Sequence, residues 1–334
     1  MRIVALAGGI GGARFLRGLL TAVPDAEITV IGNTGDDITL FGLRVCPDLD
    51  TVMYTLGGGI NEEQGWGRAA ETFSVREELA EYGVGPAWFT LGDRDFATHI
   101  VRTQMLDAGY PLSAVTKALC ERWRPGLRLI PMSDDRVETH VVITDPGHPR
   151  GDLALGVDTR SKITPGREAG KRAIHFQEWW VRLHASVPAE SIVAVGAEDA
   201  KPAPGVLEAI ESADVVLLPP SNPVVSIGTI LAVPGIRPAI EAKRVVGVSP
   251  IIGGAPVRGM ADACLTAIGV ETSAQAVAAH YGPALLDGWL VDTADAGAAV
   301  DGIAVGARPL LMTDVRAAAD IAAAALELAR DLDT

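Results

Sequence analysis

One short segment near the N-terminus constrains the fold most. An apolar run of strand length, residues 2–7, leads directly into the glycine-rich stretch GGIGG at 8–12, and a helical pattern follows from Ala13. A glycine-rich turn between a strand and a helix N-terminus suits a phosphate group, because bare backbone N–H groups and the helix dipole both face the anion. The segment therefore predicts an open α/β sheet with an anion site at its edge.

Strand-length apolar runs alternate with helical patterns along much of the chain, which is typical of a parallel sheet wrapped by helices. The predicted strands are 2–7, 28–32, 191–195, 214–219, 245–250, 287–292 and 308–312. The predicted helices are 13–22, 204–212, 225–232, 236–242, 260–268, 273–280 and 314–331. Asp314 is the expected N-cap of the last helix. The fold class that follows is α/β: a Rossmann-like, mostly parallel sheet with helices on both faces.

The middle of the chain departs from this alternation. Its predicted elements are helices 68–82, 95–108 and 112–122 and strands 137–144 and 172–183. The stretch of about 145–171 is rich in Gly, Pro and charges, which predicts a mobile hairpin loop. We therefore expect residues 1–59 and 190–334 to form a nucleotide-binding core, with residues 60–189 inserted as a largely helical cap that also holds a β-hairpin.

Composition excludes several classes of protein. With 334 residues and a net charge of −14, the chain lacks the basic excess that nucleic acid requires of a partner. No apolar run reaches about 18 residues and the N-terminus does not resemble a signal peptide, so we expect no membrane span. The three cysteines lack metal-binding spacing, which favours buried thiols in a cytoplasmic protein.

The glycine turn favours a phosphate or nucleotide other than NAD. Gly9, Gly11 and Gly12 resemble the start of the dinucleotide fingerprint, but Arg14 stands where its third glycine should be. The second strand ends in Gly-Asn rather than in the acidic residue that holds a ribose, so Asn33 is a candidate ligand contact. A nicotinamide cofactor and a purely structural tight turn remain the alternatives.

Four carboxylates follow the second strand: Asp36, Asp37, Asp48 and Asp50. They would repel a phosphate unless a cation lies between them, and Mg²⁺ binds one or two carboxylates together with water and phosphate. In extended chain, Asp48 and Asp50 would point to one face and could share such a cation. We therefore predict Asp36, Asp48 and Asp50 as magnesium ligands; the alternative is that Asp48 only caps a helix that begins near Leu49.

A second polar cluster, residues 91–99 (LGDRDFATH), combines two acids, an arginine and a histidine at a turn and a helix start. Arg94 could hold a phosphate or a polar ring edge through its planar donor fork, and Asp93 is a candidate contact beside it. His99 lies one helical turn after Asp95 and could be held by it. The alternative is a solvated loop pair with Asp95 as an N-cap.

Two further strand ends carry small polar residues where a helix should begin. Ser221 and Asn222 follow one strand and Ser249 follows another, so each junction is a possible anion site or an ordinary helix cap. Residues 175–182 (HFQEWWVR) alternate polar and apolar types, which predicts a strand that packs its aromatic side chains in the core or forms a wall for a flat ring.

Together these segments resemble a known family. The motifs AGGIGGARFL, GDD, CPDLDT, LGDRDFATHIVR, SDD, HFQEWWVR, PSNPVVSIG and VSPIIGGAPVRGMAD are similar to those of the 2-phospho-L-lactate transferases of deazaflavin coenzyme F-420 biosynthesis, from end to end. The segments RVCPDLDTVMYTLGGGI and GYPLS are most similar to the actinobacterial branch, whose donor is a guanosine diphosphate-linked enolpyruvate rather than the lactyl form.

The resemblance implies a magnesium-dependent transfer to the deazaflavin Fo. The terminal ribityl hydroxyl of Fo would attack the phosphorus next to the enolpyruvoyl or lactyl group, GMP would leave, and dehydro coenzyme F-420-0 or coenzyme F-420-0 would form. It maps acceptor contacts onto Asp48 or Asp50 and onto Arg94, gives the cap the role of covering the acceptor, and implies a homodimer. The alternative is a related family of sugar-nucleotide-binding regulators of metabolism, which share a similar glycine turn.

Overall fold

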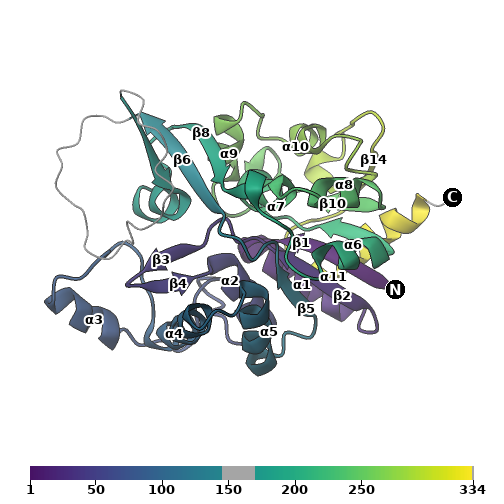
Figure 1. The fold of residues 1–334 in the computed structure, drawn as a ribbon. Coiled ribbons are helices and arrows are strands. Elements are labelled where there is room, and N and C mark those ends of the chain that lie inside the picture. The colour runs from purple at the N-terminus through teal and green to yellow at the C-terminus, as the bar shows by residue number, and fades with distance from the viewer. Residues whose placement is uncertain (145–169, 333–334) are drawn as a thin grey trace.

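The computed structural model describes residues 1–144 and 170–332, and its centre is a seven-stranded sheet (Figure 1). The strands of this sheet are β1 (Arg2–Ala7), β2 (Glu27–Gly32), β5 (Arg128–Pro131), β9 (Val215–Leu218), β10 (Val245–Val248), β13 (Gly288–Val291) and β14 (Ala304–Ala307). Every pair of neighbours runs parallel. The predicted α/β, Rossmann-like class is confirmed.

The strand order is β14-β13-β10-β9-β1-β2-β5, with β1 near the middle. From β1, the chain adds β2 and then β5 on one side, and β9, β10, β13 and β14 on the other. The order therefore reverses between β1 and β9. Ligands of open α/β sheets bind at such a switch point, outside the carboxyl ends of the strands.

Helices cover both faces of the sheet because the side chains of each strand alternate between two apolar cores. In β1, Val4 and Leu6 belong to one core, and Ile3, Ala5 and Ala7 belong to the other. The second core is formed with α1 (Gly9–Ala22), α2 (Pro47–Leu56), α5 (Leu112–Trp123) and α11 (Val315–Asp331). The first core is formed with α6 (Val206–Ser212), α7 (Thr229–Ala232), α8 (Ile236–Glu241), α9 (Ala261–Ala267) and α10 (Ala274–Tyr281).

Smaller units flank the carboxyl edge of the sheet. The hairpin of β3 (Ile38–Leu40) and β4 (Leu43–Val45) shares a small core with α4 (Asp93–Asp107). A three-stranded antiparallel sheet has the order β7 (Lys171–His175), β6 (Glu138–Thr144) and β8 (Ala189–Val195). The remaining elements are α3 (Ser74–Glu81), β11 (Ile251–Ile252), β12 (Ala255–Pro256), the π-helices η1 (Glu178–Arg182) and η3 (Pro223–Gly228), and the 3₁₀ helices η2 (Ala197–Asp199) and η4 (Thr293–Asp295).

One predicted strand lies in a different sheet from the one expected, and one strand of the central sheet is absent from the prediction. Residues 191–195 form part of β8, which pairs with β6 rather than with the central sheet; its residues are half-buried, unlike those of a central parallel strand. Conversely, β5 lies within residues 60–189 and yet pairs with β2 in the central sheet. The last strand is β14 rather than 308–312: the Arg308 N–H still donates to the Val291 carbonyl, but Pro309 has no N–H to continue the ladder.

The strand predicted over 175–182 is also wrong beyond His175. Residues 178–182 form the π-helix η1, and Phe176 and Trp179, three residues apart, are both buried in one small core. That spacing is helical, and the burial of these two rings outweighs the apparent alternation. The predicted helix 68–82 is shorter, covering only α3.

Other details agree with the sequence. The Asp314 carboxylate accepts the Ala317 N–H at 2.8 Å, which confirms it as the N-cap of α11. The predicted loop of about 145–171 lies outside the described residues except for Gly170 and Lys171. Across residues 1–144 and 170–332, the helices fall short of what a membrane crossing would require in length and hydrophobicity.

Candidate active site

The site is built at the switch point, where β1 and β9 end side by side. The Gly8 carbonyl accepts the Ser221 hydroxyl at 2.9 Å, and the Gly8 N–H donates to the Ser221 Oγ at 3.3 Å. A Cβ at Gly12 would lie only 2.6 Å from the same hydroxyl oxygen. Ser221 therefore ties the start of α1 to the end of β9 and uses its hydroxyl within the chain.

The glycines of the turn serve two purposes. The helix α1 begins at Gly9, four residues earlier than predicted, so the turn and the helix N-terminus coincide. Side chains at Gly8 and Gly11 would overlap the Asp48 carboxylate and the Pro220 carbonyl respectively. Gly9 has a φ of +65°, which favours glycine, and a Cβ there would approach only the Asp48 Oδ1, at 3.8 Å. Close packing explains Gly8, Gly11 and Gly12, whereas Gly9 leaves backbone accessible beside Asp48.

Asp48 lies next to this turn in the first turn of α2. Asn33 donates through Nδ2 to the Asp48 carboxylate at 2.8 Å and to the Val225 carbonyl at 3.1 Å, and its Oδ1 accepts the Gly35 N–H at 2.9 Å. Burial raises the pKa of Asp48 to about 6, although hydrogen bonds from Asn33 and from the Gly9 backbone oppose the shift. Asn33 thus orients the carboxylate instead of lying free for a ligand.

Asp36 lies close to Asp48, and within residues 1–144 and 170–332 no positively charged side chain pairs with it. Burial raises the pKa of Asp36 well above its usual value, and the nearby negative charges of Asp48 and Asp37 raise it further. Its Oδ1 has no hydrogen-bond partner among the residues that the structure describes, and neither does the buried Thr34 hydroxyl. Two close carboxylates and an unsatisfied buried oxygen are what a divalent cation would neutralise.

The donor set fits Mg²⁺ better than a metal held by a full protein cage. Among residues 1–144 and 170–332, no group of three or more His, Cys, Asp or Glu is placed to bind one ion. Mg²⁺ needs only one or two carboxylates, because water and substrate phosphates complete its octahedron. Asp36 and Asp48 supply that pair beside the glycine turn.

The extended conformation predicted around Asp48 and Asp50 is wrong. Residues 47–56 form α2, with Pro47 as the first helical residue, a position that proline favours because its missing N–H would have no helical partner. Two residues apart on a helix, the two carboxylates diverge. Asp48 points to the glycine turn, and Asp50 points to α4, so the geometry expected for a shared cation is absent. The helix N-cap is Cys46, so Asp48 is not the cap either.

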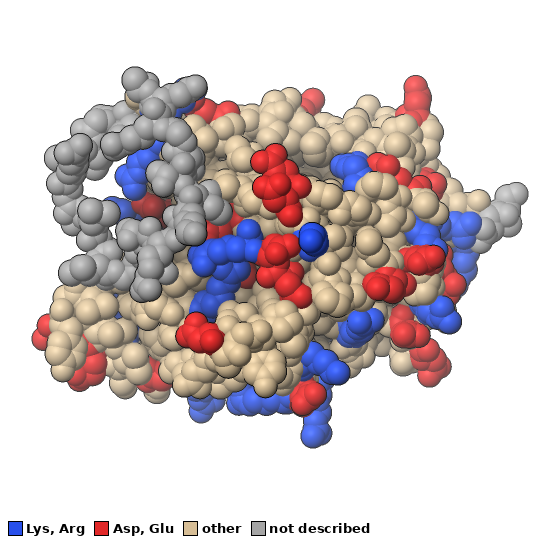
Figure 2. Space-filling model, viewed as in Figure 1, with Lys and Arg blue, Asp and Glu red and all other residues tan. Residues whose placement is uncertain are grey.

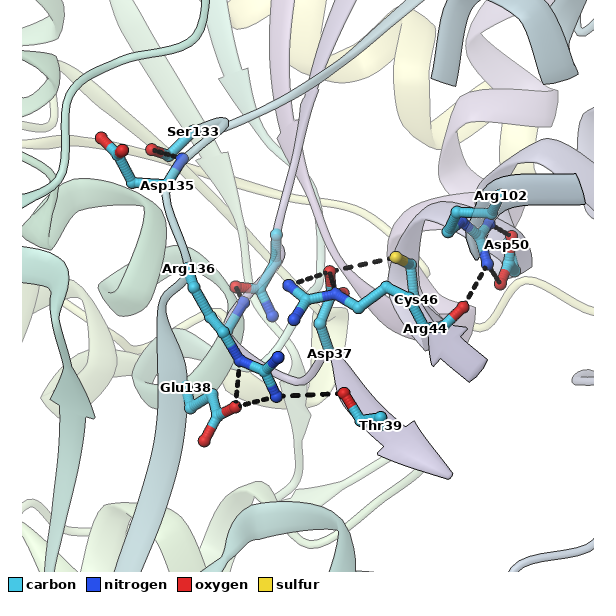
Figure 3. Close-up of polar contacts among 12 residues, drawn as sticks. Asp37, Thr39, Arg44, Cys46, Asp50, Arg102, Ser133, Asp135, Arg136 and Glu138 are labelled. Atoms are coloured by element: carbon cyan, nitrogen blue, oxygen red, sulfur yellow. Dashed lines mark hydrogen bonds and ion pairs between the residues drawn. The ribbon is translucent and has the colours of Figure 1, made fainter. Parts of the chain in front are cut away.

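Asp50 is bound by an arginine that the sequence reasoning did not single out. Arg102 is only 1% exposed, and its two terminal nitrogens donate to the two oxygens of Asp50 (Figure 3). The Arg102 Nη1 also lies 3.0 Å from the His99 Nδ1. The Asp50 charge raises the pKa of Arg102 despite the opposing effect of burial. Arg102 follows His99 by three residues on α4, and that helical spacing is the signal that could have identified it.

The network continues through His99 to Asp95. The His99 Nε2 lies 3.4 Å from the Asp95 carboxylate, as the one-turn spacing predicts, and the Tyr54 hydroxyl donates to the same oxygen at 2.7 Å. Burial would raise the pKa of Asp95, but the His99 ring and the Tyr54 hydroxyl more than compensate and lower it. These contacts join α2 to α4.

Asp37, like Asp50, is a buried carboxylate that an arginine of the chain neutralises. Arg44 donates to it at 2.9 Å and the Cys46 thiol contacts it at 3.0 Å (Figure 3). Burial raises its pKa, and Arg44 opposes the rise. His175, from the HFQEWWVR segment, lies 3.2 Å from the Asp37 carbonyl oxygen, and its burial lowers its pKa to about 4. A neutral His175 therefore fixes the loop that carries Asp36.

The remaining predicted residues, all within the described ranges, make no hydrogen bond or ion pair with Asp36 or Asp48. Asn222 caps η3 by accepting the N–H groups of Val224 and Val225, and the Ser249 hydroxyl bonds within its own loop to Ile251. Asn222 therefore matches the helix-cap alternative. The helix expected after Ser249 is absent, because the short strand β11 follows there. Arg94 is exposed at the start of α4, and Asp93 accepts N–H groups of α3. The face in Figure 2 shows basic and acidic side chains adjoining one another near its centre.

Comparisons with other proteins agree with the motifs. A family model described as 2-phospho-L-lactate transferase CofD matches residues 3–308. Proteins named phosphoenolpyruvate transferase are similar over 99% of this chain and 99% of their own length, at 68% identity in Thermobifida fusca and 69% in Streptomyces griseus. A crystal structure of a upf0052 family protein from Bacillus halodurans has a TM-score of 0.58 at 17% identity and covers 97% of this chain and 99% of its own; this likeness concerns the fold. Since the family model spans nearly the whole chain, the chain belongs to the 2-phospho-L-lactate transferase CofD family.

Proposed function

We propose that this protein transfers an enolpyruvoyl-phosphate or 2-phospholactyl group from a guanosine diphosphate-linked donor to the deazaflavin Fo. GMP would leave, and dehydro coenzyme F-420-0 or coenzyme F-420-0 would form. The observation that carries the proposal is the buried Asp36–Asp48 pair beside the glycine turn, which no counter-charge from the described part of the chain neutralises. The names of the relatives, phosphoenolpyruvate transferase, favour the enolpyruvoyl donor.

The start of α1 and the Asp36–Asp48 pair would bind different groups. The N–H groups at the start of α1 would face the donor's diphosphate, because they lie at a helix N-terminus at the switch point. Asp36 and Asp48 would hold Mg²⁺. When bound, Mg²⁺ would neutralise charge on the diphosphate and polarise the phosphoryl group.

Asp50 would act through position. Both of its oxygens are engaged by Arg102, so we assign it to fixing α2 against α4 rather than to the cation. This keeps Asp48, two residues earlier in α2, in place beside the glycine turn. Arg94 has no hydrogen bond or ion pair from its side chain within the described ranges and would be free to contact the acceptor. Phosphoryl transfer depends chiefly on such positioning and charge neutralisation.

Product analysis tests the proposal. Purified protein is incubated with Fo, MgCl₂ and either the enolpyruvoyl or the lactyl guanosine donor, and the products are identified by mass spectrometry. We expect one phosphodiester product and an equal amount of GMP, and no product after EDTA treatment. Asp48→Asn is the matched control, because it keeps the shape of the side chain and removes its charge.

The same samples separate the alternatives. Fo fluorescence titration distinguishes a transferase from a sugar-nucleotide-binding regulator, which would not bind the deazaflavin. Thermal shifts with GDP and Mg²⁺ but not with NAD(P) would exclude a nicotinamide enzyme. Absence of Fo binding together with absence of product from either donor would overturn the proposed function.

A further inference from the structure

The helices α3 and α4 begin next to each other, and each start is capped by a carboxylate from the other's flank. Glu71, three residues before α3, accepts the N–H groups of Arg94 and Asp95 at 2.8 and 2.9 Å. Asp93, the first residue of α4, accepts the N–H groups of Ser74 and Val75 at 3.1 and 2.9 Å. Neither helix has a capping side chain at its own N-cap position. The two starts are therefore fixed reciprocally.

Gly92 makes this arrangement possible. A Cβ at Gly92 would overlap the Glu71 carboxylate, so any larger residue would push Glu71 away from the α4 start. The φ of Gly92 is −83°, which other residues adopt readily. The glycine of the GDRD motif is thus explained by the closeness of Glu71 and not by backbone conformation.

A third contact holds the main chain of Arg94 from the other side. The Arg68 Nη1 donates to the Arg94 carbonyl at 3.0 Å. The Arg68 guanidinium lies 4.8 Å from the Trp123 ring centroid and 5.8 Å from that of Tyr54, which limits its movement. The N–H and the carbonyl of Arg94 are both fixed, while its side chain is exposed to solvent.

We propose that Glu71 is a positioning residue for the transfer reaction: by capping α4 it sets the direction in which the Arg94 side chain leaves the helix. The inference rests on the proposed function, in which Arg94 contacts the acceptor Fo. Glu71 itself touches no substrate. Its carboxylate offers two acceptor oxygens to two adjacent N–H groups, and this geometry defines the first turn of α4.

The test is Glu71→Gln in the full-length protein with MgCl₂. An amide has one acceptor oxygen and no charge, so one N–H bond is lost and the other is weakened. We expect the KM and the Kd for Fo to rise about tenfold, with kcat within about twofold of wild type. Hydrogen exchange of the Arg94 and Asp95 amides should become faster. Gly92→Ala should reproduce these changes and should add little to Glu71→Gln, because both remove the same contact.

Thr72→Val is the matched control. It removes the hydroxyl that bonds to Asp93 at 2.6 Å, one residue from Glu71, and leaves both Glu71 contacts intact. We expect wild-type values for Fo. Faster exchange in Glu71→Gln with an unchanged Kd and KM for Fo would overturn the inference, because Glu71 would then be only a helix cap. Wild-type protein that neither binds Fo nor forms product would instead overturn the proposed function, and the inference with it.

Discussion

The first turn of α2 carries two buried aspartates, and the two sides of this turn differ in where the counter-charge comes from. Asp50 is bound by both terminal nitrogens of Arg102, so the chain supplies its cation. Asp48 receives only neutral hydrogen bonds, its pKa is raised to about 6 by burial, and its neighbour Asp36 is also acidic. Asp50 is therefore neutralised within the chain, whereas no positive charge from the described residues, 1–144 and 170–332, pairs with Asp48.

This difference separates a structural role from a ligand-binding one. A buried charge that is paired and hydrogen-bonded joins elements together, as Asp50 does for α2 and α4. Burial of a carboxylate pair without a cation lowers the stability of the folded state. Such a pair is typical of a functional site, where a bound ligand can offset the loss. We therefore propose that Asp48 and Asp36 bind the ligand, whereas Asp50 fixes the position of α2.

Removal of Arg102, the positively charged partner of Asp50, should have the largest effect on stability. Arg102→Met leaves Asp50 buried and unpaired, and we expect the free energy of unfolding to fall by about 3–5 kcal/mol. Urea denaturation measures the change. The double variant Asp50→Asn/Arg102→Met removes the stranded charge and should recover part of the loss. Equal stability of the wild type and Arg102→Met would show that the Asp50 side of the turn is not held by this pair.

Asp48→Asn tests the proposed cation-binding side of the α2 turn. We expect turnover to fall about 100- to 1,000-fold, because the variant loses a charged group at the proposed cation site. The fold should remain, since an amide of the same shape can still accept the Gly9 N–H. Steady-state kinetics and circular dichroism measure the two effects. Turnover within a few-fold of wild type at saturating Mg²⁺ would refute the role of Asp48.

The pH dependence of the free energy of unfolding tests, without substrate, whether Asp48 is buried next to no positive charge of the described residues. The pKa of Asp48 rises from an ordinary 3.8 to about 6 on folding, so the folded state binds its proton more tightly than the unfolded state. Stability from this group is present below pH 4, declines between pH 4 and 6, and is lost above pH 6, by about 3 kcal/mol in all. Denaturation of metal-free protein across this range measures it. The slope should be smaller in Asp48→Asn, and added Mg²⁺ should raise stability at pH 7.5 in the wild type only.

The sequence predicts the glycine turn and the Asp48 side of the site better than the Asp50 side. The glycine turn after β1 and the acids after β2 follow from strand ends, which local patterns identify well, and the sheet edge then brings them together. The Asp50 side depends on Arg102, which lies in a different helix from Asp50. Helical spacing places Arg102 on the same face of α4 as His99, but no local pattern specifies that this face meets Asp50 of α2.

The extended conformation expected for Asp48 and Asp50 is wrong for a local reason, because Pro47 at the first helical position favours a helix. A second difference comes from tertiary packing. The strand β5 comes from within the segment expected to form the cap and completes the central sheet beside β2. Short apolar runs specify a strand but not its partner, because pairing is decided by tertiary packing.

The smallest effect is expected at the Tyr54–Asp95 hydrogen bond between α2 and α4. Tyr54→Phe removes the hydroxyl that donates to Asp95 at 2.7 Å and leaves the ring against Trp123, whose centroid is 4.8 Å away. We expect the free energy of unfolding to fall by about 1–2 kcal/mol, because a buried carboxylate loses one of its donors. Turnover should change little, since the Asp48 side keeps all of its contacts. A loss of turnover comparable to that of Asp48→Asn, measured at a temperature where Tyr54→Phe is fully folded, would mean that the two sides of the α2 turn act as one unit.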